Sequence, residues 1–166
     1  MKLDLAGRGY FNYTIGGFWR SFSAAIIAFP IFLALTLLHS WLHRGQEFLE
    51  LEVAGLRYLA GWLTYPLVTL LLVKLLDRTA NYVAYVITIN WLMVPQLLLS
   101  LVVSAFRLAI PPEAGALLTI FLLMLLVYYD FFISRTVLDL TAGKACLVVF
   151  IGLLVTSVMD IIFYPY

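Results

Sequence analysis

Long apolar segments separated by short polar connections recur along the whole chain. An α-helix needs about 20 mainly apolar residues to cross the hydrocarbon core of a bilayer. The segments that meet this rule are residues 22–41, 56–76, 82–106, 114–134 and 143–163. The pattern therefore predicts an all-α polytopic membrane protein with about five transmembrane helices, which form a single integral membrane domain over residues 1–166.

Polar and aromatic positions flank the first of these segments. Residues 6–22 read AGRGYFNYTIGGFWRSF, in which glycines interrupt a long helix and aromatic rings suit the headgroup region. We therefore expect residues 1–21 to form an interfacial segment on the membrane surface. After the first span, HRGQEFLELEVAGLR spaces its polar and apolar residues as a short amphipathic surface helix would. No apolar core precedes the first span, so we expect no cleavable signal.

Composition supports the same class of protein. Of the 166 residues, 64% are hydrophobic and 11% are charged, whereas a soluble domain carries about 25% charged residues. The net charge of +1 gives no reason to expect a nucleic-acid partner. Cys146 is the single cysteine, which excludes a disulfide or a cysteine-based metal site within one chain.

The distribution of lysine and arginine predicts the orientation of the helices. If the N-terminus is cytoplasmic, that side holds seven basic residues and the other side holds three. The first group is Lys2, Arg8, Arg20, Lys74, Arg78, Arg135 and Lys144, and the second is Arg44, Arg57 and Arg107. We therefore expect a cytoplasmic N-terminus and a C-terminus on the outer face of the membrane.

Asp130 is an acidic residue inside the fourth predicted span. At a rise of about 1.5 Å per residue it lies about 24 Å from Ala114, which places it near the cytoplasmic headgroups. We expect it to form a structural ion pair with Lys144, Lys74 or Arg135. The alternative is a proton or ion gate, because ionisable residues inside membranes are costly and often functional.

The third predicted span holds two deeper amides. Asn90 lies about 12 Å and Gln96 about 21 Å along the helix from Tyr82, so both are expected to form hydrogen bonds across helices, worth about 0.6 kcal/mol each. The first three spans also carry prolines near their middles. These prolines could frame a cavity for a lipid or a small solute, or serve ordinary packing. They are Pro30, Pro66 and Pro95.

Few residues suggest chemistry. His39, His43 and Glu47 would share one helix face, and two imidazoles with a carboxylate can bind a divalent metal. Gly45 interrupts that helix and no fourth ligand is evident, so ordinary interfacial histidines are favoured. The chain has no phosphate-binding loop, HExxH motif or nucleophile elbow. We therefore expect neither an enzyme, nor a cofactor, nor a bound metal.

Small residues mark the last predicted span. Gly152 and Thr156 are four residues apart and form a small-xxx-small seam, which allows close approach of two helices. The seam either packs inside the bundle or docks another subunit.

The aromatic N-terminal segment, the closely spaced spans and the phrase SRTVLDLTAGKACLVVF resemble the Yip1-like group of small five-helix membrane proteins. In that group a polar turn of small residues followed by Lys-Ala often precedes the final span, as residues 141–145 do here. GFWRSF and Asn90-Trp91 also resemble segments of small bacterial inner-membrane proteins. This resemblance implies a location in the bacterial inner membrane, where the outer face is the periplasmic one. The resemblance lies more in topology than in identity. It implies an adaptor or trafficking role without catalytic residues.

These observations predict a non-catalytic accessory or assembly protein of the membrane. Its expected partners are membrane lipids and other membrane proteins or further copies of itself. The alternative is a small transporter or channel that uses a cavity framed by the first three, proline-kinked helices.

Overall fold

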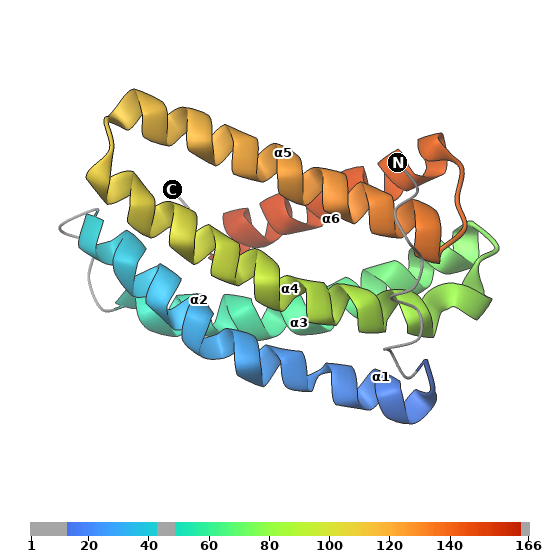
Figure 1. The fold of residues 1–166 in the computed structure, drawn as a ribbon. Coiled ribbons are helices and arrows are strands. Elements are labelled where there is room, and N and C mark those ends of the chain that lie inside the picture. Colours follow the sequence, from blue (N-terminus) through green and yellow to red (C-terminus); the bar gives the residue numbers. More distant parts are fainter. Residues whose placement is uncertain (1–12, 43–48, 164–166) are drawn as a thin grey trace.

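The computed structural model shows a bundle of long helices that run alongside one another (Figure 1). It describes residues 13–42 and 49–163. The helices are α1 (Ile15–Ser21), α2 (Ser23–Leu42), α3 (Leu49–Leu75), α4 (Tyr82–Phe106), α5 (Pro112–Val137) and α6 (Ala142–Phe163), with 3₁₀ turns at Thr79–Asn81 and Arg107–Ala109. The described part contains no strand, and five helical stretches are long and apolar enough to cross a membrane. The predicted helical class is confirmed.

α1 belongs to the bundle. The side chain of Thr14 accepts a hydrogen bond from the backbone N–H of Gly17 at 3.1 Å and so caps the start of this helix. α1 then packs against the beginning of α4, where the rings of Phe18 and Tyr82 are 5.9 Å apart. Ile15–Ser21 is therefore in contact with the bundle through Phe18, and its location at the membrane surface stays a prediction. Residues 1–12 lie outside the described residues.

α3 is longer than the second predicted span. It runs without interruption from Leu49 to Leu75 and includes Pro66 in its interior. Residues predicted to form a separate amphipathic helix are thus the first turns of α3, as far as the structure describes them. Residues 43–48 of that stretch lie outside the described part.

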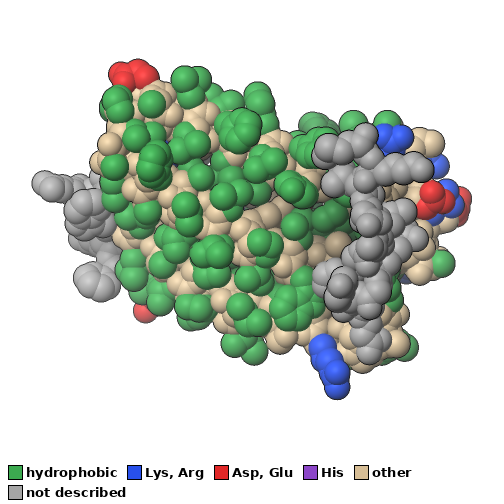
Figure 2. All heavy atoms as spheres, in the orientation of Figure 1, with side chains coloured by type: hydrophobic (Ala, Val, Ile, Leu, Met, Phe, Trp, Pro, Cys, Tyr) green, Lys and Arg blue, Asp and Glu red, His purple; other side chains and the backbone are tan. Residues whose placement is uncertain are grey.

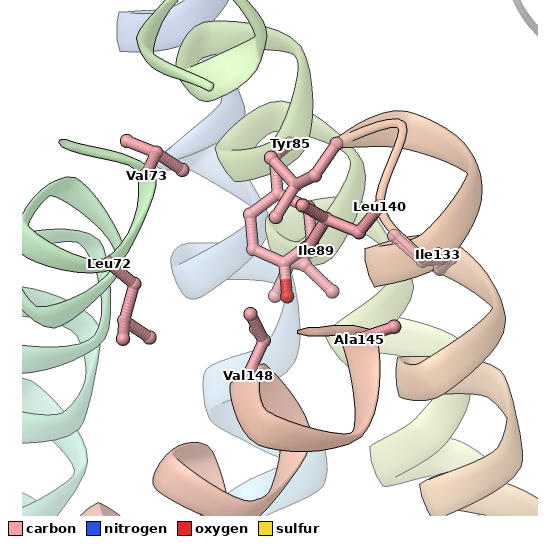
Figure 3. Close-up of a cluster of buried hydrophobic side chains, with 9 residues drawn as sticks. Leu72, Val73, Tyr85, Ile89, Ile133, Leu140, Ala145 and Val148 are labelled. Carbon is pink, nitrogen blue, oxygen red and sulfur yellow. The ribbon is translucent and has the colours of Figure 1, made fainter. Parts of the chain in front are cut away.

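α4 is the central helix and packs against α1, α2, α3 and α5. Its buried Tyr85 and Ile89 lie in a cluster with side chains from α3, α5 and α6, including Val73, Ile133 and Val148 (Figure 3). A second cluster joins α2 and α3 through Ala24, Ala28, Tyr58 and Trp62. Alanines on α2 leave room for these two rings, and the Tyr58 hydroxyl donates a hydrogen bond to the Ala25 carbonyl at 2.6 Å.

Two helix ends meet at one end of the bundle. Asp77 follows α3 and Asp139 follows α5, each with a positive φ, of 56° and 52° respectively. The residue after each aspartate closes the turn by donating its backbone N–H to a carbonyl five residues back. Arg78 then ties the turns together: its Nε donates to the Asp139 carbonyl at 3.1 Å and its guanidinium lies 3.7 Å from the Asp139 carboxylate.

The outer surface of the bundle is mainly apolar. Figure 2 shows hydrophobic side chains over most of the visible face, while lysine and arginine lie toward one end. Ile26 and Leu75 are 77% and 80% exposed, and many other large apolar side chains are exposed along every long helix.

We call the end with the two aspartate turns the basic end. Its described basic residues are Arg20, Lys74, Arg78, Arg135 and Lys144.

Candidate functional site

A partly open cavity of about 280 Å³ lies between the helices, with walls from α2, α3, α4, α5 and α6. Most of its lining is apolar, and aromatic rings form one wall. The apolar side chains are Phe32, Tyr58, Trp62, Met93, Leu97, Leu126, Val155 and Met159. The polar ones are Arg57, Thr64, Tyr65, Gln96, Ser100 and Thr156. The sequence suggested a cavity framed by the first three, proline-containing spans. The observed cavity differs, because α5 and α6 also line it and Pro30, Pro66 and Pro95 do not.

Gly61 helps to create this space. It lines the cavity from α3, and a Cβ atom added to it would meet no heavy atom within 4 Å. A larger residue at position 61 would project into this open volume. The neighbouring aromatic side chains on α3, Tyr58 and Trp62, are buried. The cavity therefore depends on the absence of a side chain at one helix position.

Gln96 and Asp130 meet beside the cavity. Nε2 of Gln96 donates a hydrogen bond to Oδ1 of Asp130 at 3.2 Å. Side chains lean toward the N-terminus of their own helix. Since α4 and α5 run in opposite directions, the two side chains lean toward each other. Gln96 lines the cavity, so the Asp130 carboxylate lies directly behind a cavity wall.

This arrangement differs from the ion pair predicted for Asp130. In the part of the chain that the structure describes, the ion pairs are Arg57–Asp160 and Arg78–Asp139, and Lys74, Arg135 and Lys144 are exposed at the basic end. α5 does not stop at Ser134 but continues to Val137, seven residues past Asp130, which is about 10 Å. Asp130 is thus further inside the bundle than predicted, out of reach of the lysines.

A chain of hydroxyl groups leads from the cavity toward the basic end. The Tyr65 hydroxyl lines the cavity and lies 3.0 Å from the Tyr85 hydroxyl, which is 2.9 Å from Oγ of the buried Ser134. Sequence reasoning missed these three hydroxyls, because tyrosines among apolar residues resemble ordinary core or interfacial residues.

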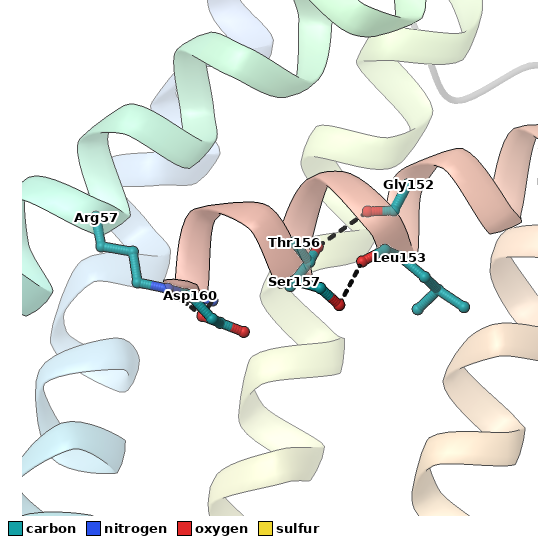
Figure 4. Close-up of polar contacts among 6 residues, drawn as sticks. All are labelled: Arg57, Gly152, Leu153, Thr156, Ser157 and Asp160. Atoms are coloured by element: carbon teal, nitrogen blue, oxygen red, sulfur yellow. Dashed lines mark hydrogen bonds and ion pairs between the residues drawn. The ribbon is translucent and has the colours of Figure 1, made fainter. Parts of the chain in front are cut away.

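An ion pair lies at the other side of the cavity. Arg57 of α3, which lines the cavity, pairs with Asp160 near the end of α6 (Figure 4). The sequence placed both residues on the same side of the membrane but did not pair them. Their separation of 103 residues carries no periodic signal that would connect them.

The remaining predicted polar residue lies away from the cavity. The buried Asn90 donates from Nδ2 to Oγ of Ser21 at 2.8 Å, which joins α4 to α1. Asn90 and Gln96 therefore both have side-chain partners on other helices, with Ser21 and Asp130 respectively.

The small-residue seam of α6 faces the bundle at Gly152. A Cβ added to Gly152 would lie 4.0 Å from the ring of Tyr65 on α3. The Thr156 hydroxyl donates to the Gly152 carbonyl at 3.1 Å within the helix, and Thr156 borders the cavity (Figure 4). Of the two alternatives left open by the sequence, these contacts favour packing inside the bundle at this position.

The predicted metal candidates are only partly placed. His39 is exposed near the end of α2, while His43 and Glu47 lie outside the described residues. Among the residues that are described, no group of three or more histidine, cysteine, aspartate or glutamate side chains is positioned to hold a metal ion.

Comparisons with protein families, with curated proteins and with solved structures found no match for this chain. The resemblance to Yip1-like proteins therefore stays a prediction from the sequence, and the cavity itself is the starting point for a functional proposal.

Proposed function

We propose that this chain is an integral membrane protein that binds one small, mainly apolar molecule in the cavity between its helices and does not convert it chemically. Support for the membrane location comes from five long apolar helices whose exposed surface is also apolar. A soluble monomer rarely exposes contiguous apolar patches of more than a few hundred Å².

The cavity is the observation that carries the proposal. Its aromatic and aliphatic walls with a few polar groups have the usual composition of a small-molecule site. A volume of about 280 Å³ suits a single acyl chain segment or a compact amphiphile and is too small for a whole phospholipid. The bound molecule would be a membrane component, since the surrounding bilayer is the nearest source of apolar ligands.

The proposed biological setting follows the sequence prediction. The protein acts as an accessory or assembly factor in the bacterial inner membrane, with a cytoplasmic N-terminus, and binds lipids together with other membrane proteins or further copies of itself. The basic end supports the orientation, because positively charged residues favour the cytoplasmic side.

A small transporter is the second candidate. The hydroxyl chain of Tyr65, Tyr85 and Ser134 supports it, since this chain continues from the cavity toward the basic end. A transporter would release the bound molecule to either side of the membrane. Uptake of a labelled ligand by protein-containing liposomes, compared with empty ones, separates transport from binding alone.

Binding itself is tested with 8-bromo-1-octanol, an amphiphile whose bromine quenches tryptophan fluorescence at short range. The protein is placed in phosphatidylcholine nanodiscs, where Trp62 reports from the cavity wall. We expect a saturable component of quenching above the linear partitioning into lipid. Gly61→Leu should remove it by filling the cavity.

Gly55→Leu is the matched control. Gly55 is also on α3 with no heavy atom within 4 Å of an added Cβ, but it does not line the cavity. Saturable quenching should survive in this variant. Equal and purely linear quenching in the wild type and both variants would rule out the proposed binding function.

A further inference from the structure

The charges around the cavity do not balance. The guanidinium of Arg57 is paired with Asp160 at one side of the cavity, so these two groups neutralise each other. Asp130 lies behind the Gln96 wall with no lysine, arginine or histidine at ion-pair distance among the described residues. One carboxylate without an ion-pair partner therefore lies in contact with Gln96, a residue of the cavity wall.

The Asp130 carboxylate orients the side-chain amide of Gln96, which lines the cavity. A carboxylate only accepts hydrogen bonds, so the NH₂ group of Gln96 must face Asp130. The amide oxygen is then the group left to interact with a ligand at this wall of the cavity. An amide dipole aligned in this way, with a carboxylate behind it, favours positive charge in front of the oxygen.

The aromatic part of the cavity wall suits the same kind of ligand. Phe32, Tyr58 and Trp62 all line the cavity, and their rings contact one another, with centroids 4.6 Å apart for Phe32 and Tyr58 and 6.0 Å apart for Tyr58 and Trp62. The faces of aromatic rings attract cations, most strongly where water is excluded. Aromatic rings with a nearby carboxylate are a common combination for recognising organic ammonium groups.

We infer that the ligand of this cavity is a lipophilic organic cation, an ammonium group on an apolar body, whose charge is balanced by Asp130 through Gln96. This inference rests on the proposed binding function and adds the chemical class of the ligand. An anionic amphiphile is disfavoured, because the one basic residue on the cavity wall is already paired with Asp160. A neutral amphiphile fits the walls but leaves the carboxylate without a counterion.

The test uses three probes with the same brominated chain: (8-bromooctyl)trimethylammonium, 8-bromo-1-octanol and 8-bromooctanoate. The quaternary ammonium keeps its charge at every pH. Saturable quenching is measured in phosphatidylcholine nanodiscs and corrected for partitioning into protein-free nanodiscs. Nearby opposite charges interact strongly in a medium of low polarity, so we expect the cation to bind about tenfold more tightly than the alcohol and the octanoate least tightly.

Asp130→Asn keeps an acceptor for Gln96 and removes the charge. It should abolish the preference for the cation and leave the affinity for the alcohol unchanged. Asp77→Asn is the control, because Asp77 is an exposed acid that does not line the cavity, and asparagine tolerates its positive φ of 56°. This variant should bind the cation as the wild type does.

The outcomes separate the inference from the function on which it rests. Saturable binding of the alcohol with equal or weaker binding of the cation in the wild type would overturn the inference and keep the proposed function. An unchanged preference for the cation in Asp130→Asn would also overturn it. Absence of saturable binding for all three probes would overturn the binding function itself. The comparison of probes on the wild type is decisive even if Asp130→Asn does not fold.

Discussion

Gln96 on α4 donates its side-chain N–H to the Asp130 carboxylate on α5 at 3.2 Å, and Gln96 itself lines the cavity between the helices. Gln96→Leu removes the donor and leaves a half-buried carboxylate without this partner. We expect a loss of about 1–2 kcal/mol in the free energy of unfolding. Thermal unfolding in detergent micelles, followed by circular dichroism, measures it.

A double-mutant cycle checks that the loss comes from this contact. In an Asp130→Leu background, Gln96→Leu should cost much less, because no carboxylate remains to be left unpaired. Additive effects of the two substitutions would show that the hydrogen bond does not contribute to stability.

Asn90 gives a second prediction at another helix contact. Its Nδ2 donates to Oγ of Ser21 at 2.8 Å, and both side chains are buried between α1 and α4. Ser21→Ala should cost about 1 kcal/mol, since it leaves a buried amide donor without its acceptor. Ser23→Ala, at an exposed position two residues away, should have little effect on the same melting temperature. Equal shifts for both alanine variants would contradict the role given to Ser21.

These two amides show what the sequence could and could not predict. Polar side chains deep in an apolar helix need partners, so hydrogen bonds across helices were expected for Asn90 and Gln96. The sequence could not predict which residues their hydrogen-bond partners are. Helical periodicity fixes the helix face that a residue occupies, but it does not show which neighbouring helix lies opposite that face. Ser21 was placed in a surface segment, and the donor to Asp130 was expected to be a basic side chain.

The helix boundaries show the same limit. The apolar runs predicted the five long helical stretches, since their length and composition are local properties of the chain. Charged residues such as Arg135 and Arg57 were taken as signs of helix ends or surface helices, whereas α5 and α3 continue through them. A helix tolerates charges near either of its ends when they reach the surface or pair with another helix, as Arg57 near the start of α3 does with Asp160.

Gly152 tests whether the seam on α6 belongs to the bundle. A leucine side chain there would run into the ring of Tyr65, so Gly152→Leu should destabilise the fold by about 1–3 kcal/mol. Gly152→Ala should be tolerated, because a contact of 4.0 Å leaves room for a methyl group. Gly143→Leu, in open space on the same helix, is the control.

Cross-linking decides between folding and association for the same variant. Cys146 is exposed on α6 and is the single cysteine, so a bismaleimide joins two copies only if their α6 helices are close. A Gly152→Leu protein with unchanged melting temperature and a loss of cross-linked dimer would show that the seam docks a second copy.

The orientation of the bundle gives a further prediction. The basic residues Lys74, Arg78, Arg135 and Lys144 lie at one end, which we expect to face the cytoplasm. A reporter fused after Arg78 should therefore be cytoplasmic, and one fused after Tyr166 should be periplasmic. Reporters in the same compartment would contradict an arrangement of five membrane spans.

The central claim is that the cavity holds a small molecule from the membrane. Native mass spectrometry of the protein, extracted under mild conditions, tests this claim most directly. We expect the wild type and Gly55→Leu to carry one additional small molecule per chain, and Gly61→Leu to be released without it, since its side chain fills the cavity. Retention of the same molecule by Gly61→Leu, or its absence from all three proteins, would contradict the account.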